Sequence, residues 1–451
     1  MKIRFIYPTR YLEDGRLLKS SRYFFPQAIF PLLAALTPPA HDVSIVDELF
    51  EAIDFDEPVD LVGISLYTYN AQRGYEIADE YRRRGVRVAI GGLHAALTPR
   101  EPAPHADAVF VGEAEETWPR FLRDLAAGNA ATVYEPDRPP AIDRLPVPRY
   151  DLIEKYRARY VTGPRRSLAR LLLGRLVPVQ TARGCPHACE FCAVAGMFRG
   201  SYRPRPIPAV IDEIRALRAG TVVFIDDHLF ADHARARDLF TALVPLRVRW
   251  VGQANVGAAD DEDLLRLARR SGCSGLFVGL ESISRASLDS VGKEINRVER
   301  YERQLLVFRK AGIDLDVSMM FGYDTDGPSI FRETHDFLVR NGVPFSGWQP
   351  LRPYPGTRFH ERLNREGRLK DDRWWLNPGL NRKVFDLKFA TRTMPEEVFR
   401  ENLYREYRRF YSVPSTFRRI LLRPQRRILF KLAMTLGYRH RLTKQTFITE
   451  Y

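Results

Sequence analysis

Short runs rich in β-branched and aromatic residues alternate with helical stretches twice along this chain of 451 residues. Within the first third, five such runs occur at residues 2–7, 42–47, 61–67, 86–92 and 107–113. Strands that alternate with helices join through right-handed crossovers and form a parallel sheet covered on both faces. The first third is therefore predicted to be a Rossmann-like α/β domain, whose ligand crevice lies at the carboxyl ends of its strands.

The same alternation resumes between residues 176 and 352. Six β-rich runs occur in this stretch, at residues 176–184, 220–227, 247–255, 275–282, 313–322 and 345–351. Six parallel strands in one series fit either a second doubly wound sheet or a partial barrel. Both architectures place their chemistry at the carboxyl ends of the strands. The fold class predicted for the whole chain is α/β.

A proline-rich segment separates the two runs. Residues 135–150 hold five prolines in sixteen positions, a composition typical of a semi-rigid spacer. A chain of this length also exceeds what one hydrophobic core usually organises. We therefore expect a Rossmann-like domain at residues 1–134 and a linker at 135–177. A six-unit β/α domain should follow at 178–355, and a helical extension with a basic tail at 356–451.

Positive charge is concentrated at the C-terminus. The net charge is +14, and residues 401–451 contribute +9 of it through twelve Lys and Arg against three Glu. A surface for nucleic acid would spread this charge along the chain, so we expect no nucleic-acid partner. Residues 414–442 interleave Phe, Ile and Leu with arginine, which is typical of a helix that contacts an anionic membrane. A solvated basic helix packed on the preceding domain is the alternative.

The N-terminal residues, the lengths of the apolar runs and the cysteines indicate a cytoplasmic protein. Residues 1–10 have neither the apolar region nor the cleavage site of a secretory signal, and no apolar run approaches the roughly 20 residues that span a bilayer. The chain has four cysteines, and three of them are clustered. Clustered cysteines in a reducing compartment more often bind metal than form disulfides.

The clustered cysteines are Cys185, Cys189 and Cys192, spaced C-x₃-C-x₂-C directly after a predicted strand. One loop can place three such thiolates around a metal centre. Structural zinc normally takes four protein ligands, whereas three ligands leave a coordination position open for chemistry. His187 is the candidate fourth ligand of a zinc site, but it lies between two of the cysteines with little chain to reach back. The fourth cysteine, Cys273, is predicted to be a small buried hydrophobe.

The sequence "RGCPHACEFC" resembles the cluster loop of radical S-adenosylmethionine (SAM) enzymes. The resemblance implies that the three cysteines hold three irons of a four-iron, four-sulfur (4Fe-4S) cluster, and that SAM chelates the fourth iron. It also implies that Phe191, directly before the last cysteine, packs near SAM. On this reading the second α/β run is a partial (β/α)6 barrel.

The later strand ends agree with this resemblance. It implies that Asp226 and Asp227 accept the ammonium group of SAM, although a pair of helix N-cap carboxylates is the alternative. The remaining positions implied to lie near SAM are Gln253, Glu281, Ser282, Phe321, Gly322 and Leu351. Gln253 is equally compatible with a plain turn residue. Glu281 is the strongest of these candidates, because a carboxylate that closes an otherwise apolar strand favours a functional role.

The first domain then resembles the cobalamin-binding domain of one large subgroup of radical SAM enzymes. The stretches "VGISLYTYN", "AIGGLHAAL" and "FVGEAEETW" carry this resemblance. The residues implied to contact cobalamin are Ser65, Thr68, Gly91, Gly92 and His94; the alternative for the two glycines is a tight turn. The loop after the first strand, "YPTRYLEDGRLL", has no histidine. Cobalamin is therefore expected without a protein imidazole below cobalt, and loss of cobalamin by the domain stays open.

The resemblance implies a cobalamin-dependent radical SAM enzyme. In such an enzyme the reduced cluster cleaves SAM, the deoxyadenosyl radical removes hydrogen from an unactivated carbon, and methylcobalamin delivers a methyl group. Its partners would be a small-molecule or lipid-like substrate and an external electron donor. A cyclase or rearrangement enzyme without methyl transfer, and a non-catalytic corrinoid or iron–sulfur protein, are the alternatives. A methylthiotransferase is disfavoured because no cysteine precedes Cys185.

Overall fold

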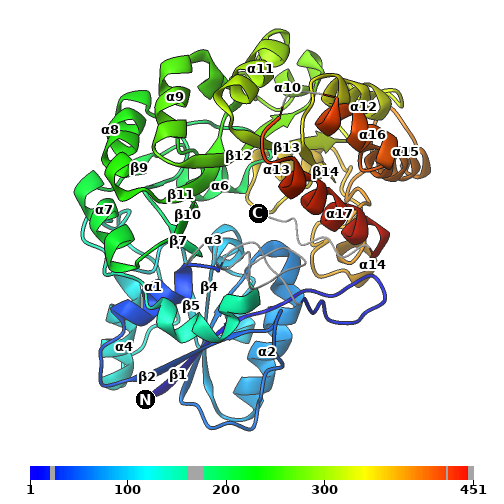
Figure 1. The fold of residues 1–451 in the computed structure, drawn as a ribbon. Coiled ribbons are helices and arrows are strands. Elements are labelled where there is room, and N and C mark those ends of the chain that lie inside the picture. Colours follow the sequence, from blue (N-terminus) through cyan, green and yellow to red (C-terminus); the bar gives the residue numbers. More distant parts are fainter. Residues whose placement is uncertain (21–25, 160–175, 423–424, 445–451) are drawn as a thin grey trace. The chain divides into compact units, whose positions relative to one another are not determined.

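The computed structural model describes residues 1–20, 26–159, 176–422 and 425–444 (Figure 1). The chain divides into two compact units. The first comprises Met1–Thr162 together with Tyr354–Thr357 and Asp371–Lys383, and the second comprises Gly163–Pro353, Arg358–Lys370 and Val384–Tyr451. No helix in the described ranges combines the length and the apolarity needed to cross a membrane.

The first unit is built on a six-stranded parallel sheet with the order β2-β1-β3-β4-β5-β6. Its strands are β1 (Lys2–Tyr7), β2 (Asp42–Asp47), β3 (Leu61–Ser65), β4 (Arg87–Gly91), β5 (Ala108–Phe110) and β6 (Val133–Tyr134). Its helices are α1 (Ile29–Leu36), α2 (Ala71–Arg83), α3 (Leu93–Leu97), α4 (Thr117–Ala126) and α14 (Pro378–Asn381), with 3-10 turns η1 (Thr68–Asn70), η2 (Ala103–His105) and η3 (Tyr150–Arg159). Because β1 lies between β2 and β3, the direction in which the sheet grows reverses there, and this places the ligand crevice beyond the carboxyl ends of β1 and β3.

The core of this unit contains a segment that is distant in sequence. Apolar side chains of β3, β4 and α2 pack together, and Trp374 and Trp375 join the same buried cluster. The indole Nε1 of Trp375 donates a hydrogen bond of 2.9 Å to Oε1 of Glu101. The short segment Asp371–Lys383 is therefore part of the first unit, although it follows the second sheet in the chain.

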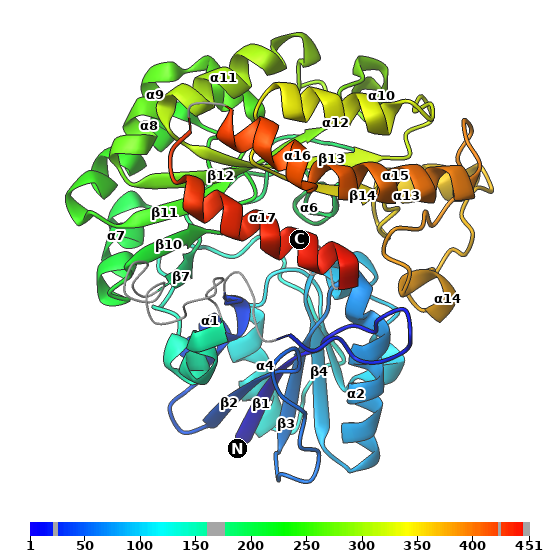
Figure 2. The same ribbon diagram turned by 45° about the vertical axis from the view of Figure 1, so that its right-hand side comes forward.

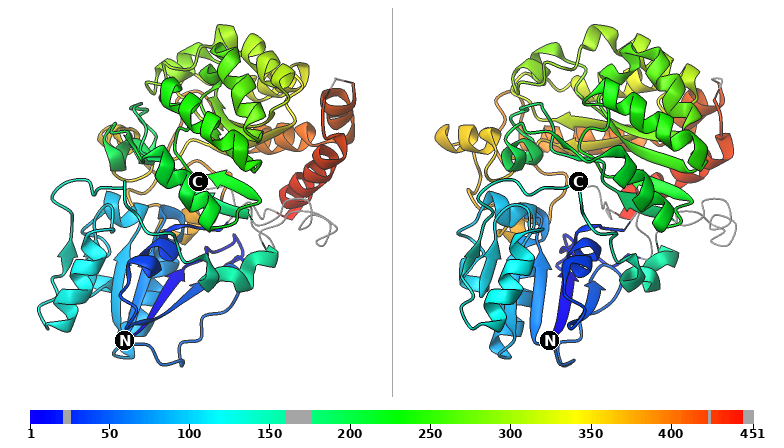
Figure 3. Two further views of the ribbon diagram at one scale, coloured as in Figure 1. Left: turned by 60° about the vertical axis from the view of Figure 1, so that its left-hand side comes forward. Right: turned by 90° about the vertical axis from the view of Figure 1, so that its left-hand side faces the viewer.

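The second unit is built on another six-stranded parallel sheet, with the sequential order β7-β10-β11-β12-β13-β14. Its strands are β7 (Leu176–Val179), β10 (Thr221–Phe224), β11 (Arg249–Ala254), β12 (Cys273–Glu281), β13 (Asp314–Phe321) and β14 (Phe345–Pro350). When every right-handed crossover steps in the same direction, all the helices lie on one face of the sheet. This order is that of a partial barrel, and the views in Figure 3 show the helices along its outer face.

The helices of the second unit follow its strands in turn. They are α6 (Ala193–Phe198), α7 (Ile207–Ala216), α8 (His233–Leu243), α9 (Glu262–Arg270), α10 (Arg285–Asp289), α11 (Tyr301–Ala311), α12 (Ile330–Arg340), α13 (Arg358–Arg365), α15 (Glu396–Phe410), α16 (Val413–Thr416) and α17 (Ile428–Lys444). Shorter turns are η4 (Val244–Leu246), η5 (Val256–Asp260), η6 (Val298–Arg300) and the π-helical η7 (Phe417–Leu421). A small antiparallel pair, β8 (Ala182–Arg183) and β9 (Arg203–Pro204), flanks the cysteine segment. The α/β fold with a helical C-terminus is thus confirmed.

Candidate functional site

The three clustered cysteines lie in a loop between β8 and α6, at the carboxyl end of the first barrel strand. All three thiols are free, Cys189 is buried, and Cys185 and Cys192 are half-buried. The loop is tightly turned, because the amide of Cys192 donates a hydrogen bond to the carbonyl of Cys189 (3.2 Å) and its own carbonyl accepts one from Gly196 (3.2 Å). Burial raises the pKa of each thiol, to about 11 for Cys192, so metal binding has to displace protons.

Gly184 allows the chain to enter this loop. Its φ is +78°, and a Cβ at this position would lie 2.1 Å from the carbonyl oxygen of Ser201. Only glycine fits such a conformation and such a close approach.

The three cysteines of this loop suit an iron–sulfur cluster, in which each cysteine would bind a different iron. In the part of the chain that is described, no three or more His, Cys, Asp or Glu side chains converge to hold a single metal ion. His187 lies near His228 instead, with their ring centroids 5.6 Å apart.

Asp226 and Asp227 fasten the cysteine loop to the end of β10. Asp226 is fully buried and accepts hydrogen bonds from the amide of Thr181 (3.0 Å) and from its hydroxyl (2.7 Å). Asp227 accepts one from the amide of Gly184 (3.0 Å), directly before Cys185. Burial raises the pKa of both carboxyl groups to about 6. The two residues predicted to bind the ammonium group of SAM thus already have donors from the protein, and these hydrogen bonds shape the loop.

Lys293 faces the cysteine loop from the segment after β12, and no local pattern in the sequence indicates this. Its Nζ lies 2.9 Å from Oε1 of Glu281 and 5.8 Å from the ring centroid of Phe191. Burial disfavours its charged form, but the attraction of Glu281 and of the Cys189 thiolate is stronger, so the pKa of Lys293 is raised. A cation beside three thiolates stabilises their charged form.

Glu281 ends β12 in a left-handed conformation, with φ +65°. The register of β12 against β13 shifts at this point, between Gly279 and Glu281. The carboxylate folds back so closely that a Cβ on Gly279 would lie 2.1 Å from its Oε1. A non-glycine residue with positive φ carries strain and is found mostly where function requires it.

Three buried polar atoms near the carboxyl ends of the barrel strands have no hydrogen-bond partner within the protein. They are Oε2 of Glu281, Nδ1 of His228 and the hydroxyl of Tyr323. Buried polar atoms are rarely left without a partner, so a polar ligand is expected to supply one. SAM fits this requirement, since it carries an ammonium group, a carboxylate, ribose hydroxyls and an adenine. His228 and Tyr323 were not predicted, although both lie within the stretches "FIDDHLF" and "FGYDTDG".

The other residues predicted to lie near SAM occupy the same strand ends. Gln253 is half-buried in β11, and Ser282 is buried directly after β12, where its hydroxyl accepts a hydrogen bond from the amide of Ser284 (3.1 Å). Leu351 is fully buried, and its amide donates to the carbonyl of Phe321 (2.8 Å). Their contact with SAM stays a prediction.

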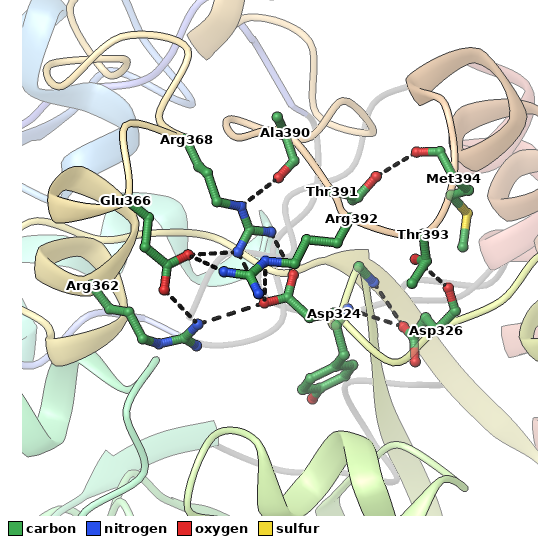
Figure 4. Close-up of polar contacts among 12 residues, drawn as sticks. Asp324, Asp326, Arg362, Glu366, Arg368, Ala390, Thr391, Arg392, Thr393 and Met394 are labelled. Carbon is green, nitrogen blue, oxygen red and sulfur yellow. Dashed lines mark hydrogen bonds and ion pairs between the residues drawn. The ribbon is translucent and has the colours of Figure 1, made fainter.

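Gly322 begins the loop after β13, and a buried carboxylate holds this loop in place. Asp326 accepts hydrogen bonds from the amides of Gly322 (2.9 Å) and Tyr323 (3.1 Å) and from the hydroxyl of Ser287 (2.9 Å). Next to it, Asp324 is surrounded by arginines, as Figure 4 shows. One of them, Arg362, also contacts Glu190 of the cysteine loop (3.3 Å). The loop after β13 and the cysteine loop are therefore joined by ion pairs.

Cys273 lies at the start of β12, at the opposite end of that strand from Glu281. It is fully buried, and burial raises the pKa of its thiol. This environment is that of a packing residue.

In the first unit, the residues predicted to bind cobalamin lie together at the ends of β3 and β4. Ser65 ends β3, Thr68 follows it, and both are buried. A Cβ on Gly92 (φ +98°) would lie 2.6 Å from the amide of Leu66, and one on Gly91 would lie 3.2 Å from Cβ of Phe110. Gly92 is thus already required by the packing of the chain itself, and a side chain at Gly91 would press on Phe110.

His94 is completely buried, and both of its ring nitrogens have protein partners. Nε2 lies 2.9 Å from Oε1 of Glu101, and Nδ1 lies 3.3 Å from Oγ1 of Thr68. Glu101 also accepts hydrogen bonds from Tyr75 (2.9 Å) and Trp375 (2.9 Å). Burial alone would raise the pKa of Glu101, but these donors outweigh it and hold that pKa below its usual value. His94 is therefore part of a polar network inside the domain.

The carboxyl edge of the first sheet has features that fit a bound cofactor. Gly112, two residues after the end of β5, has φ +83° and no atom within 4 Å of a Cβ built on it. Thr117, at the start of α4, has a buried hydroxyl without a hydrogen-bond partner in the protein. Arg10 follows β1 at the switch point, and burial lowers its pKa to about 10. An open backbone, an unpartnered donor and a buried cation suit a large polar ligand such as cobalamin.

The comparisons with known families agree with both sites. Residues 179–338 match the radical SAM superfamily, and residues 34–122 match the B12 binding domain. The chain is therefore a radical SAM protein with a B12-binding domain. It belongs to the cobalamin-dependent radical SAM enzymes, whose cofactors are a 4Fe-4S cluster, SAM and cobalamin.

Curated relatives are similar over most of the chain. Bacteriochlorophyllide d C-8(2)-methyltransferase of Chlorobaculum tepidum is 26% identical over 427 residues, which are 92% of this chain and 91% of that protein. Hopanoid C-2 methylase of Rhodopseudomonas palustris is 25% identical over 365 residues, which are 77% of this chain and 66% of that protein. Among solved structures, the radical SAM methyltransferase TsrM of Kitasatospora setae, with cobalamin and a [4Fe-4S] cluster bound, has a TM-score of 0.67 at 17% identity. That match covers 98% of this chain and 99% of TsrM, and it supports the fold.

Proposed function

We propose that this protein is a C-methyltransferase that methylates an unactivated carbon of a small-molecule or lipid-like substrate. The observation that carries the proposal is the combination, in one chain, of a B12-binding domain and a radical SAM barrel. The similarity to a methyltransferase extends over nine-tenths of both chains and includes both domains. A protein that used the barrel alone would have no need of the first domain.

The residues of the chain have distinct tasks in this function. Cys185, Cys189 and Cys192 hold the cluster and leave one iron open to SAM. When bound, the cluster supplies the electron that cleaves SAM, and cobalamin carries the methyl group to the substrate. Asp227 holds the cysteine loop through Gly184, and Glu281 offers its free oxygen Oε2 to a donor group of SAM. No side chain is assigned a direct role in the reaction with the substrate.

The partners that we propose are a small-molecule or lipid-like substrate, an external one-electron donor in the cytoplasm and, at the basic C-terminal segment, a membrane surface. Support for the substrate class comes from the relatives, which are named for action on bacteriochlorophyllide and on a hopanoid.

The proposal can be tested without knowing the substrate. The full chain is reconstituted anaerobically with iron, sulfide and cobalamin and is then given dithionite and SAM with a deuterated methyl group. Two products are measured: deoxyadenosine, which reports radical cleavage of SAM, and S-adenosylhomocysteine together with deuterated methyl in the cobalamin fraction. A methyltransferase is expected to form both.

Each departure from this result has a defined meaning. Deoxyadenosine without methyl transfer to cobalamin would favour the cyclase or rearrangement enzyme. Cobalamin and cluster binding without either product would favour a non-catalytic corrinoid or iron–sulfur protein. A stoichiometric zinc content with no iron would contradict the assignment of the cysteines.

A further inference from the structure

The last described helix, α17, buries three polar side chains on its inner face and exposes two leucines on its outer face, where Arg439 and His440 are also exposed. The residues that it buries lie on one face, at positions 431, 435, 438 and 442, and three of these four are Lys431, Thr435 and Tyr438. The opposite face carries Leu429, which is 84% exposed, and Leu436, which is 65% exposed. Helices on the surface of a soluble domain normally have the reverse pattern.

Specific polar contacts hold α17 in this orientation. Lys431 forms an ion pair with Asp314 at the start of β13 (2.7 Å), and the hydroxyl of Tyr438 donates to Oδ2 of Asp316 (2.6 Å). The ring of Tyr438 also stacks on that of Tyr411, with centroids 5.0 Å apart. These contacts fix which face of the helix points outward. The exposure of Leu429 and Leu436 therefore follows from the packing of α17 on the second unit.

The segment before α17 also exposes large apolar side chains. Twelve large apolar side chains are exposed in the described residues, and seven of them fall between positions 413 and 436. The seven are Val413, Phe417, Leu421, Leu422, Leu429, Phe430 and Leu436. Figure 2 shows α17, in red, on the outside of the second unit, near α16. Exposed apolar side chains that gather in one region mark a binding surface, whereas single ones do not.

The charged side chains that this segment itself contributes are all positive. Residues 407–449 contain eleven Lys and Arg and no Asp or Glu. Arg418 and Arg426 are exposed beside the apolar side chains, and Arg427 is also exposed but pairs with Asp314 (2.6 Å). Arg426 also lines a cavity of about 320 Å³ at the foot of α17, together with Arg309 and Lys431. An apolar face bordered by cations complements a surface with an apolar interior and anionic headgroups.

We propose that this face, defined by Val413, Phe417, Leu421, Leu422, Leu429, Phe430 and Leu436, docks the enzyme on an anionic lipid bilayer. The apolar side chains enter the boundary between headgroups and acyl chains, and the arginines contact lipid phosphates. The inference deepens the proposed function and rests on it in one respect, because a lipid-like substrate would reach the enzyme from that bilayer. A second copy of the chain would need acidic side chains opposite the arginines, and this region offers none.

The test is vesicle binding by the full-length, cluster-loaded protein. Co-sedimentation is measured with vesicles of phosphatidylcholine alone and with vesicles that also contain phosphatidylglycerol. We expect binding to the anionic vesicles only, and weaker binding at high salt. The double variant Leu429→Glu with Leu436→Glu is expected to reduce the affinity at least about 10-fold, because two apolar side chains no longer enter the interface. Arg418→Gln with Arg426→Gln is expected to weaken binding to anionic vesicles alone.

Matched controls carry the same change at exposed apolar positions outside this region. Leu306→Glu on α11 and Val133→Glu on β6 replace side chains that are 37% and 49% exposed, and they are expected to bind vesicles normally. Equal vesicle binding by the double variant and the wild type would overturn the proposal. A double variant that binds vesicles normally but has a lower mass by light scattering would assign the face to a second copy.

The same preparations separate this inference from the proposed function. SAM cleavage to deoxyadenosine is measured in solution with each variant, since the region lies far in sequence from the cysteine loop. Retained cleavage with lost vesicle binding supports the docking face. Normal vesicle binding without any cleavage would contradict the proposed function and leave the docking face intact.

Discussion

The ammonium group of Lys293 lies 2.9 Å from Oε1 of Glu281, and both side chains are nearly closed to solvent, at 14% and 9% exposed. The pair joins the end of β12 to the loop that carries the cysteines, because Lys293 also lies over the ring of Phe191. The second oxygen of Glu281 has no partner in the protein. Only one of the two carboxylate oxygens of Glu281 therefore has a protein partner, and we expect a ligand to donate a hydrogen bond to the other.

Replacing Glu281 with glutamine should weaken SAM binding and leave the cluster in place. Loss of a charge-assisted hydrogen bond costs about 1.5–3 kcal/mol, or roughly 10- to 150-fold in affinity. The measurement is equilibrium binding of SAM to the reconstituted protein, with iron content as the check on cluster loading. Glu294→Gln, at an exposed position next to Lys293, is the matched control. Unchanged affinity in Glu281→Gln would assign Glu281 to structure alone.

Replacing Lys293 with methionine should lower the free energy of unfolding. The change leaves the carboxylate of Glu281 buried without its partner, and breaking a buried ion pair from one side costs about 3–5 kcal/mol. Urea unfolding of the apo protein measures the free energy of unfolding. The double variant Lys293→Met with Glu281→Gln should recover much of the loss, because the orphaned charge is gone. A double variant as unstable as the sum of the single ones would show that the two side chains do not interact.

Substitution of each clustered cysteine should abolish the cluster, and substitution of the fourth cysteine should not. Cys185→Ala, Cys189→Ala and Cys192→Ala each remove one of three iron ligands. Cys273→Ser changes a fully buried packing residue, and we expect normal iron content with a stability loss of about 1–3 kcal/mol. Iron and sulfide analysis after anaerobic reconstitution distinguishes them. Equal iron loss in Cys273→Ser and Cys185→Ala would mean that the ligand set is wrong.

The strands and the cysteine loop could be predicted because their signals are local. The predicted run 42–47 coincides with β2 (Asp42–Asp47), and the run 313–322 contains β13 (Asp314–Phe321). Periodicity and β-branched composition depend only on neighbouring residues. The spacing of the three cysteines is equally local, so their loop was placed correctly after the first barrel strand.

Contacts between distant segments could not be predicted in this way. Lys293 lies twelve residues after Glu281, and nothing in the intervening sequence indicates that the loop returns to it. Trp374 and Trp375 follow the second sheet, yet they pack in the core of the first unit. Likewise, the hydrogen bonds of Asp226 with Thr181 depend on how β7 and β10 lie side by side. Each of these features depends on tertiary structure, which a pattern along one chain does not contain.

Asp47 should contribute a loss of stability as the pH rises from about 4 to about 7. Burial raises the pKa of Asp47 at the end of β2 to about 7. Its folded form therefore holds a proton that the unfolded form has lost, so ionisation across this window disfavours folding. Asp47→Asn should be more stable than the wild type at pH 8 by about 2–4 kcal/mol, and nearly equal to it at pH 4. The free energy of unfolding in urea is measured at both values.

The control for this pH effect is Asp42→Asn, at the exposed start of the same strand. It removes the same charge without changing a buried group, so the dependence on pH should remain that of the wild type. An Asp47→Asn variant whose stability falls with pH as steeply as that of the wild type would show that another group carries the slope.

Cobalamin in the first unit should lack an imidazole ligand from the protein. The loop after β1 has no histidine, and His94 is buried with Nε2 and Nδ1 facing Glu101 and Thr68. To bind cobalt through one ring nitrogen it would have to give up at least one of these contacts, and loss of the Nε2 contact would leave the carboxylate of Glu101 with one donor fewer. Electron paramagnetic resonance of the cobalt(II) form decides the question, because an axial nitrogen splits each cobalt line into a triplet. We expect no such splitting in the wild type and the same spectrum in His94→Ala, which should instead lose stability. A triplet splitting that disappears in His94→Ala would show that His94 binds cobalt, and that the network around Glu101 rearranges when cobalamin enters.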